Sequence, residues 1–242
     1  MKQALISFLK RIRVYGLVRA IYRGVMRRLG SLVGTRLEAR RWANRSSPAQ
    51  SSGCLATDHP HRELILKRVS SYAPFQSLLE VGCGNGPNLH LLAKAFPDAV
   101  FRGVDINPNF VKAGTRWFKE NGVSNVGLLV GKANDLVGFP DKSFDIVLTD
   151  AVLIYVGPDK IRKVLTDAVR IARRAVILVE WHSPDANNPL GIYERHWVRN
   201  YEALLKTLDP NVSVKVFRLP EGGGFGDDLW KKWGALIEAS II

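Results

Sequence analysis

The sequence predicts an α/β protein built on a mostly parallel β-sheet with helices on both faces, preceded by a basic helical arm. Three observations predict this fold class. After residue 58, short apolar runs alternate with longer segments of helical periodicity. A glycine-rich turn, "EVGCGNG" at residues 80–86, closes the first apolar run, and positive charge gathers in the first fifty residues. Since parallel neighbours need crossovers, such alternation places helices on the sheet faces.

The arm is expected to cover residues 1–45 as a basic amphipathic helical segment. Residues 1–50 hold twelve Lys or Arg against one acid, Glu38, so they carry +11 of the formal net charge of +13. Two helical stretches with a hinge near Gly16 are predicted, because the apolar stripe rotates there. The apolar positions are Leu5, Phe8, Leu9, Ile12 and Tyr15 in the first stretch, then Val14, Val18, Ile21, Val25 and Leu29 in the second.

Several partners would suit this arm. Apolar residues combined with arginines are typical of a helix that lies on an anionic membrane, here through residues 1–30. Docking on the remaining domain or on a second subunit, binding to RNA phosphates, and an organelle transit peptide are the alternatives. No apolar run approaches the roughly 20 residues of a spanning helix, and arginines interrupt the place of a signal-peptide core. We therefore expect a cytoplasmic protein that can associate peripherally with the inner face of a membrane.

A polar, small-residue stretch, "SSPAQSSGCLATD" at residues 46–58, is predicted to be a linker to a domain at residues 59–242. The composition of the whole sequence, 46% hydrophobic and 24% charged, is typical of a soluble protein that can bury a hydrophobic core. Cys54 and Cys83 have neither metal-ligand spacing nor a disulfide framework. We expect a reducing compartment and no metal.

The elements of the domain follow from its periodicity. Strands are predicted at residues 77–82, 100–105, 125–131, 144–150, 175–181, 212–219 and 234–241. Helices are predicted at residues 59–71, 87–96, 108–121, 158–172 and 194–208. Because "PEGGGFGDDLWKK" between the last two strands is interpreted as a loop, these strands are expected to form an antiparallel hairpin at the sheet edge.

The glycine turn marks a ligand site, because open α/β sheets bind ligands beyond the carboxyl ends of their strands. Glycines there permit positive φ and allow a ligand to approach the backbone amides of the following helix. A dinucleotide motif, G-x-G-x-x-G, would need glycine where Pro87 stands. Asp105, nineteen residues past Gly86 at the tip of the second strand, is placed to accept hydrogen bonds from ribose hydroxyls.

Four motifs in order resemble the class I S-adenosylmethionine-dependent methyltransferases. They are "LLEVGCGNG" at residues 78–86, "GVDINP" at 103–108, "FPDKSFDIVLTDAVLIYV" at 139–156 and "ARRAVILVEW" at 172–181. The resemblance covers about residues 75–182 and extends to the terminal hairpin. It implies a Rossmann-like seven-stranded sheet, a methyltransferase activity and S-adenosyl-L-methionine as the cofactor.

The same resemblance implies a set of cofactor-binding residues. They are Glu80, Gly82, Cys83, Gly84 and Gly86 around the methionine end, Asp105 at the ribose, Ile106, Ala133 and Asn134 around the adenine, and Asp150 beyond the fourth strand. One position departs from the family, which often has aspartate where this chain has Lys132. Since lysine cannot accept the bond from the adenine amino group, Asn134, Asp135 or the Ala133 amide is expected to replace it.

Methyl transfer needs alignment of donor and acceptor above all, and positioning supplies roughly 7 to 11 kcal/mol of such a barrier. A base is needed only when the acceptor carries a proton of high pKa. His182 is the first candidate, with Asp150 as another, while Tyr155 is expected to shape the pocket beside the methyl group. The expected acceptor is a small molecule, a glycan or a lipid-linked compound, methylated on oxygen. The alternatives are an RNA methyltransferase that uses the basic arm and a non-catalytic relative that binds the cofactor or a protein.

Overall fold

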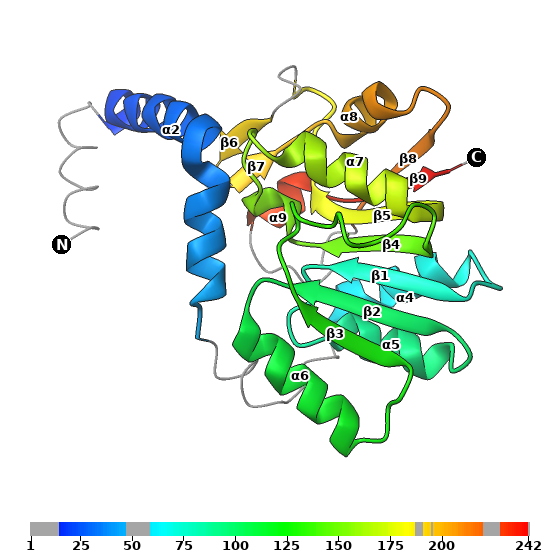
Figure 1. The fold of residues 1–242 in the computed structure, drawn as a ribbon. Helices are drawn as coiled ribbons and strands as arrows, with labels where there is room; N and C mark the ends of the chain where they lie inside the picture. The colour runs from blue at the N-terminus through cyan, green and yellow to red at the C-terminus, as the bar shows by residue number, and fades with distance from the viewer. Residues whose placement is uncertain (1–14, 47–58, 187–190, 195, 220–227, 242) are drawn as a thin grey trace.

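A seven-stranded sheet forms the centre of the molecule (Figure 1). The structure is a computed structural model that describes residues 15–46, 59–186, 191–194, 196–219 and 228–241. The strand order is β3-β2-β1-β4-β5-β9-β8. The first five strands in the chain are parallel, whereas β9 is antiparallel to both β5 and β8. The strands are β1 (Ser77–Val81), β2 (Val100–Asp105), β3 (Val126–Val130), β4 (Phe144–Asp150), β5 (Ala172–Trp181), β8 (Ser213–Arg218) and β9 (Gly234–Ser240).

This architecture confirms the predicted fold class, including the terminal antiparallel hairpin. The buried strands explain why the prediction succeeds. A strand that is covered on both faces reads as a continuous apolar run, and β4 and β9 are buried along almost their whole length. The division of the chain into arm, linker and domain stays a prediction.

Helices cover both faces of the sheet and divide the core into two layers. In β4, Ile146 and Leu148 pack in one hydrophobic cluster with residues of α4, α5 and α6, whereas Val147 packs in the other with residues of α7 and α8. The alternation of these side chains follows from the two-residue period of a strand. The helices are α4 (Pro60–Ser70), α5 (Pro87–Ala95), α6 (Pro108–Glu120), α7 (Ile161–Ile171) and α8 (Tyr201–Leu208).

Two segments differ from the sequence prediction. The helix expected over 194–208 is confined to α8, because Asn200 caps it by accepting a hydrogen bond from the Ala203 amide at 3.0 Å. The preceding residues form a short hairpin of β6 (Ile192–Glu194) and β7 (His196–Val198). The segment before β9, expected to be a loop throughout, contains the helix α9 (Asp228–Trp233), whereas its residues 220–227 lie outside the described part.

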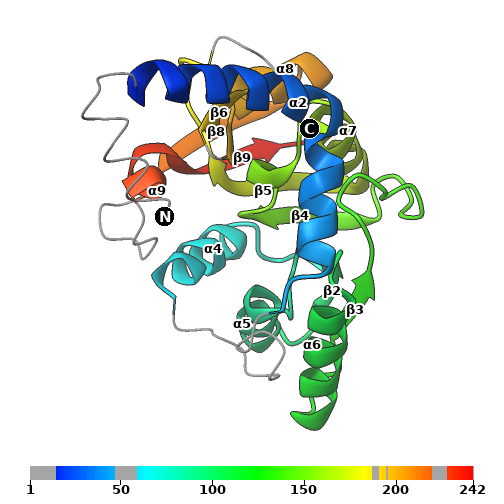
Figure 2. The same cartoon turned by 90° about the vertical axis from the view of Figure 1, so that its left-hand side faces the viewer.

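The described part of the basic arm is one helix, α2 (Tyr15–Ala43). Figures 1 and 2 show that it bends partway along: its first half reaches out past β6, and its second half runs across the carboxyl ends of the central strands. The first predicted helical stretch, residues 2–14, lies outside the described residues. No helix within the described ranges is long and apolar enough to cross a lipid bilayer.

Candidate functional site

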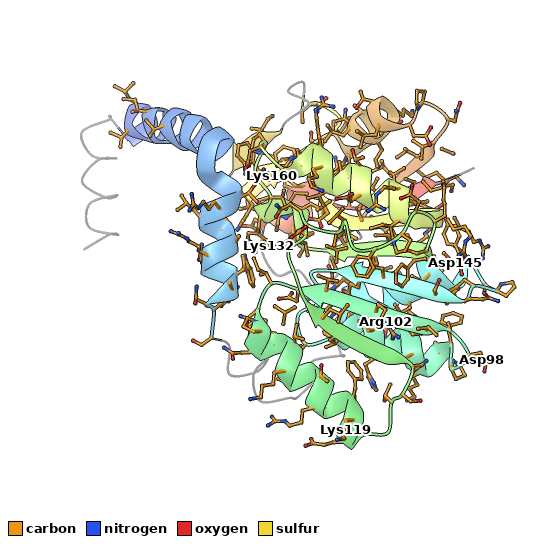
Figure 3. The ribbon with its side chains drawn as sticks, viewed as in Figure 1. Asp98, Arg102, Lys119, Lys132, Asp145 and Lys160 are labelled. Atoms are coloured by element: carbon orange, nitrogen blue, oxygen red, sulfur yellow. The ribbon has the colours of Figure 1, made fainter. Side chains whose placement is uncertain are left out.

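A cavity of about 260 Å³ lies at the carboxyl ends of β1, β2 and β4, and residues of the second half of α2 form part of its lining. This is the edge at which open α/β sheets bind their ligands. Figure 3 shows Lys132 on the side of α2 and Asp145 at the far end of the sheet, where β4 begins. The lining residues come from five regions of the chain: Thr35, Glu38, Ala39 and Trp42; Gly82 and Gly84; Val104, Asp105, Ile106 and Phe110; Gly131, Lys132, Ala133 and Asn134; and Asp150, Ala151, Val152, Tyr155 and Val156.

Most of the residues that the sequence nominates for the site are in this lining. Those that line the cavity are Gly82, Gly84, Asp105, Ile106, Ala133, Asn134, Asp150 and Tyr155. Three others, Glu80, Cys83 and Gly86, are not part of the lining. Cys83 is a buried core residue of the cluster under α4, α5 and α6. The structure does not bring His182 into the cavity.

The glycine turn is shaped by the protein's own side chains as well as by any ligand. Gly82 has a φ of 81°, and a Cβ added there would overlap the side chain of Val152. The backbone amides of the turn point inward: Gly82 and Cys83 donate to the Val104 carbonyl, and Gly84 donates to Asp105. These three amides are therefore paired within the protein, and the cofactor-binding role of Gly82, Cys83 and Gly84 stays a prediction.

Asp105 is held firmly at the tip of β2. One carboxylate oxygen accepts a hydrogen bond from the Gly84 amide at 2.8 Å, and the other accepts one from the Asn107 amide at 2.8 Å. Burial raises the pKa of Asp105, and these two hydrogen bonds oppose the rise. Each oxygen keeps a lone pair for a further donor, so the carboxylate can receive two hydroxyl groups side by side.

The segment that departs from the family pattern at Lys132 forms part of the cavity lining. Lys132, Ala133 and Asn134 line the cavity, whereas Asp135 does not. Of the polar substitutes that the sequence offers for the family's aspartate, the structure therefore brings Asn134 to the cavity. Ile106 and Phe110 supply apolar surface to the same cavity.

A network of buried polar groups lies below the other end of the cavity. The Asn88 amide donates to Glu80 at 2.7 Å and to Asp150 at 3.0 Å, and His61 bonds the same Asp150 oxygen at 2.8 Å. Arg62 donates to the Asn88 side-chain oxygen at 2.5 Å. In each carboxylate the second oxygen, Oε2 of Glu80 and Oδ1 of Asp150, is buried and has no hydrogen-bond partner among the described residues.

Two unpaired, buried carboxylate oxygens require a donor, since leaving such groups unsatisfied costs free energy. Burial raises the pKa of Glu80 to about 8, while the hydrogen bond from Asn88 opposes the rise. Burial also favours a raised pKa in Asp150, but the hydrogen bond and charge of His61, with further help from Asn88 and Arg62, lower it below its usual value. A cationic ammonium group fits this end of the cavity on both counts.

The second half of α2 forms one wall of the cavity. Trp42 packs edge-on against Tyr155, with ring centroids 4.9 Å apart. The buried Asn107 side chain donates to the Trp42 and Arg45 carbonyls at 2.9 and 2.8 Å. Thr35 donates to Asp159 and accepts from the Gly157 amide, both at 2.7 Å. These contacts fix α2 at both edges of the wall.

Glu38, the one acid in residues 1–50, faces this cavity. Its Oε1 lies 3.8 Å from Arg41, whose side chain is 74% exposed, so solvent screens the pair. Its Oε2 is buried without a hydrogen-bond partner among the described residues. With Asp105 and Asp150, Glu38 gives the cavity three carboxylates in a chain of net charge +13.

His182 has a structural environment instead. It is almost fully buried, its Nδ1 accepts a hydrogen bond from the Tyr201 amide at 3.2 Å, and its ring stacks near that of Tyr201. Burial, with a smaller contribution from the charge of Arg218, lowers the pKa of His182 to about 4. Both its place and its weak basicity argue against a role as general base.

The sequence did not predict the contribution of α2 to the site, nor those of His61 and Asn88. The apolar stripe of the arm ends near residue 29, so helical periodicity gives no signal for Thr35, Glu38 or Trp42. The isolated acid in a run of basic residues is the one local feature that marks this segment. The Asn88 network depends on residues far apart in the chain, which no local pattern reports.

The seven-stranded, mostly parallel sheet with its antiparallel hairpin, and the cavity at the carboxyl ends of its strands, are the architecture of a class I S-adenosylmethionine-dependent methyltransferase domain. The comparisons agree: residues 78–175 match the family model described as "Methyltransferase domain". The resemblance noted in the sequence is thereby confirmed. S-adenosyl-L-methionine is the cofactor of this class. The carboxylate oxygens of Glu80 and Asp150 that have no hydrogen-bond donor among the described residues could accept hydrogen bonds from its ammonium group.

Individual relatives cover only part of the chain. It is 26% identical over 156 residues to a protein-L-isoaspartate O-methyltransferase of Pyrococcus horikoshii, covering 64% of this chain and 62% of that protein. It is 30% identical over 152 residues to a fatty-acid O-methyltransferase of Mycolicibacterium smegmatis, covering 57% and 53%. The chain thus spans less than two thirds of the length of either relative.

A solved structure shows the same fold. The geranyl diphosphate C-methyltransferase of Streptomyces coelicolor, in complex with Mg²⁺, geranyl diphosphate and S-adenosyl-L-homocysteine, superposes with a TM-score of 0.62 at 13% identity. The alignment covers 86% of this chain and 98% of that one. At this identity the likeness establishes the architecture alone.

Proposed function

We propose that the protein transfers a methyl group from S-adenosylmethionine to an oxygen atom of a largely apolar small molecule or lipid. One observation carries this proposal: the side of the cavity formed by α2 and the loop after β4 is lined mainly by aliphatic and aromatic side chains. Those side chains are Ala39, Trp42, Val152, Tyr155 and Val156. Such a wall suits an apolar acceptor and offers few partners to a glycan. The fatty-acid O-methyltransferase among the relatives supports an acceptor of this kind.

The chain's residues divide the work as follows. Asp105 holds the ribose hydroxyls, while Glu80 and Asp150 hold the ammonium group. When bound, the cofactor supplies an electrophilic methyl carbon. Trp42 and Tyr155 position the acceptor by shape, which is the main source of rate in such a transfer.

Glu38 is the base in this proposal. Its unpaired, buried Oε2 accepts the proton that an acceptor hydroxyl loses as its oxygen takes up the methyl group. This replaces His182, which the sequence favoured. An acceptor that is already a carboxylate needs no base and would leave Glu38 without this role.

The test is tritium transfer from labelled S-adenosylmethionine to a total lipid extract and, in parallel, to total RNA. We expect label in the lipid fraction. Glu38→Gln should lower the rate of transfer to a hydroxyl acceptor by about a hundredfold or more while leaving S-adenosylhomocysteine binding intact. Glu202→Gln, at an exposed ion pair with Lys206, is the matched control and should change neither. Label in RNA alone would make the basic arm an RNA-binding element, and label in neither fraction despite tight binding would favour the non-catalytic relative.

A pH effect on cofactor binding is expected from Glu80. Because burial raises the pKa of Glu80 to about 8 in the protein alone, the group is mostly protonated at pH 7. An ammonium group beside it favours the ionised form, so binding releases most of one proton. The sign follows: affinity rises as pH increases toward 8.

Calorimetry in buffers of different ionisation enthalpy measures that proton directly. Wild-type protein should show a binding enthalpy that varies with the buffer at pH 7. Glu80→Gln should remove this dependence, since glutamine has no proton to release. An equal buffer dependence in both proteins would mean that Glu80 does not face the ammonium group.

A further inference from the structure

The first half of α2 presents an apolar row that nothing in the described structure covers. Leu17, Ile21 and Val25 follow one another at four-residue spacing and are 63%, 57% and 48% exposed, and Val18 beside them is 42% exposed. Residues four apart in a helix lie on one side of it. Four large aliphatic side chains exposed together on one helix mark an interaction surface.

The charge of the arm selects the partner for this row. Residues 1–50 carry a net charge of +11, whereas the remaining 192 residues carry about +2 by the same count. In the described part of α2, the arginines at positions 36, 40 and 41 are exposed to solvent. The partner must therefore offer apolar volume and negative charge together.

We propose that α2 docks on an anionic lipid surface, with Leu17, Val18, Ile21 and Val25 inserted among the acyl chains and the basic side chains at the headgroups. A helix with apolar and cationic residues is the usual form of such an interfacial anchor. A nucleic acid satisfies the charge but offers no place for the aliphatic row. A second copy of the chain would bring two arms of charge +11 together, which is unfavourable.

The anchor and the cavity share one helix. Thr35, Glu38 and Trp42, from the second half of α2, line the cavity, and hydrogen bonds to Asp159 and Asn107 hold that half in place. Docking therefore sets the distance between the lipid surface and the cavity through one continuous element. It follows, on the basis of the proposed function, that the acceptor is an amphiphile resident in that surface.

The experiment is co-sedimentation of the full chain with sucrose-loaded vesicles of phosphatidylcholine, with and without phosphatidylglycerol. We expect binding to the anionic vesicles and weak binding to the neutral ones. Ile21→Glu should weaken binding roughly tenfold, because it withdraws one large aliphatic side chain from the bilayer. Leu37→Glu is the matched control: it lies on the same helix, is also 57% exposed, and makes the same change of charge outside the row.

The outcomes separate this inference from the proposed function. A smaller, charge-related loss in Leu37→Glu than in Ile21→Glu supports insertion of the row, whereas equal losses would reduce the effect to charge alone and overturn it. Absence of binding to anionic vesicles, or a dimer in analytical ultracentrifugation that Ile21→Glu dissolves, would also overturn it. S-adenosylhomocysteine binding by Ile21→Glu should match wild type, which shows that the variant is folded and that failure to bind vesicles is independent of the methyltransferase assignment.

Discussion

Replacing Asp105 with asparagine should weaken S-adenosylhomocysteine binding by about a hundredfold, as two hydrogen bonds to a charged acceptor are worth roughly 3 kcal/mol together. Both oxygens of Asp105 already accept backbone hydrogen bonds, from Gly84 and Asn107. Asparagine has one acceptor oxygen, so its NH₂ group must face one of these two amides. The substitution therefore removes a ribose partner and disturbs the glycine turn at once. Isothermal titration calorimetry measures the loss.

Asp98→Asn is the control for this variant. It makes the same chemical change at an exposed position just before β2. This position lies at the amino end of that strand, whereas the cavity lies at the carboxyl ends (Figure 3). We expect its affinity to equal that of wild type. A dissociation constant for Asp105→Asn within a few-fold of wild type would remove Asp105 from the site and with it the ribose interpretation.

The sequence identified Asp105 because its position depends on local rules. A buried strand, a polar residue at its tip and the Asn-Pro start of the next helix are contiguous in the chain, and the Asn107 cap confirms that helix start. The same reasoning placed all seven strands of the sheet, with β5 beginning at Ala172, three residues earlier than predicted. The strand begins early because α7 ends at Ile171 and β5 starts at the next residue, with no loop between them.

The remainder of the site is not local and so escaped prediction. Trp42 reaches Tyr155, and Thr35 reaches Asp159, across more than a hundred residues of chain. Such contacts depend on how α2 docks, and the amphipathic pattern of its first half indicates nothing about its second. The three-residue strands β6 and β7 are too short to show a period, and they were absorbed into a predicted helix.

The choice between His182 and Glu38 shows the same limit in chemical terms. His182 directly follows the predicted fifth strand and Glu38 lies in the basic arm, and histidine is the commoner base of the two residue types. The environment argues against His182, because the residue lies outside the cavity lining and burial lowers its pKa to about 4. A group's environment comes from tertiary packing, which the residue type alone does not reveal.

The loop after β4, residues 151–156, contributes to the cavity lining and is held by buried hydrogen bonds. Glu180 at the end of β5 accepts hydrogen bonds from the amides of residues 152–154 and from Thr149. The fully buried Arg199 donates to the Leu153 carbonyl at 2.8 Å and to the Val156 carbonyl. A carboxylate thus holds the loop's N–H groups and a guanidinium holds its carbonyls. Ala151, at the start of the loop, has a φ of 56°, a strained value that these contacts maintain.

Arg199→Met should therefore lower the free energy of unfolding at pH 8 by about 3 to 5 kcal/mol, because it removes the buried guanidinium that donates to the Leu153 and Val156 carbonyls and whose positive charge interacts with the buried Glu180. Thermal and denaturant unfolding measure this loss. Arg162→Met, at an exposed position of α7, makes the same substitution and should change stability by less than about 0.5 kcal/mol.

The pH dependence identifies the cause. Burial raises the pKa of Glu180 to about 7, and its four hydrogen bonds oppose the rise. Since the folded-state pKa lies above the ordinary value, ionising Glu180 costs folding free energy as pH rises from about 4.5 through 7, and that cost grows when Arg199 is absent. At pH 5 Glu180 is protonated with or without Arg199, so the destabilisation by Arg199→Met should be smaller there than at pH 8. An equal loss at both pH values would show that Arg199 acts through its carbonyl contacts alone and not through the charge of Glu180.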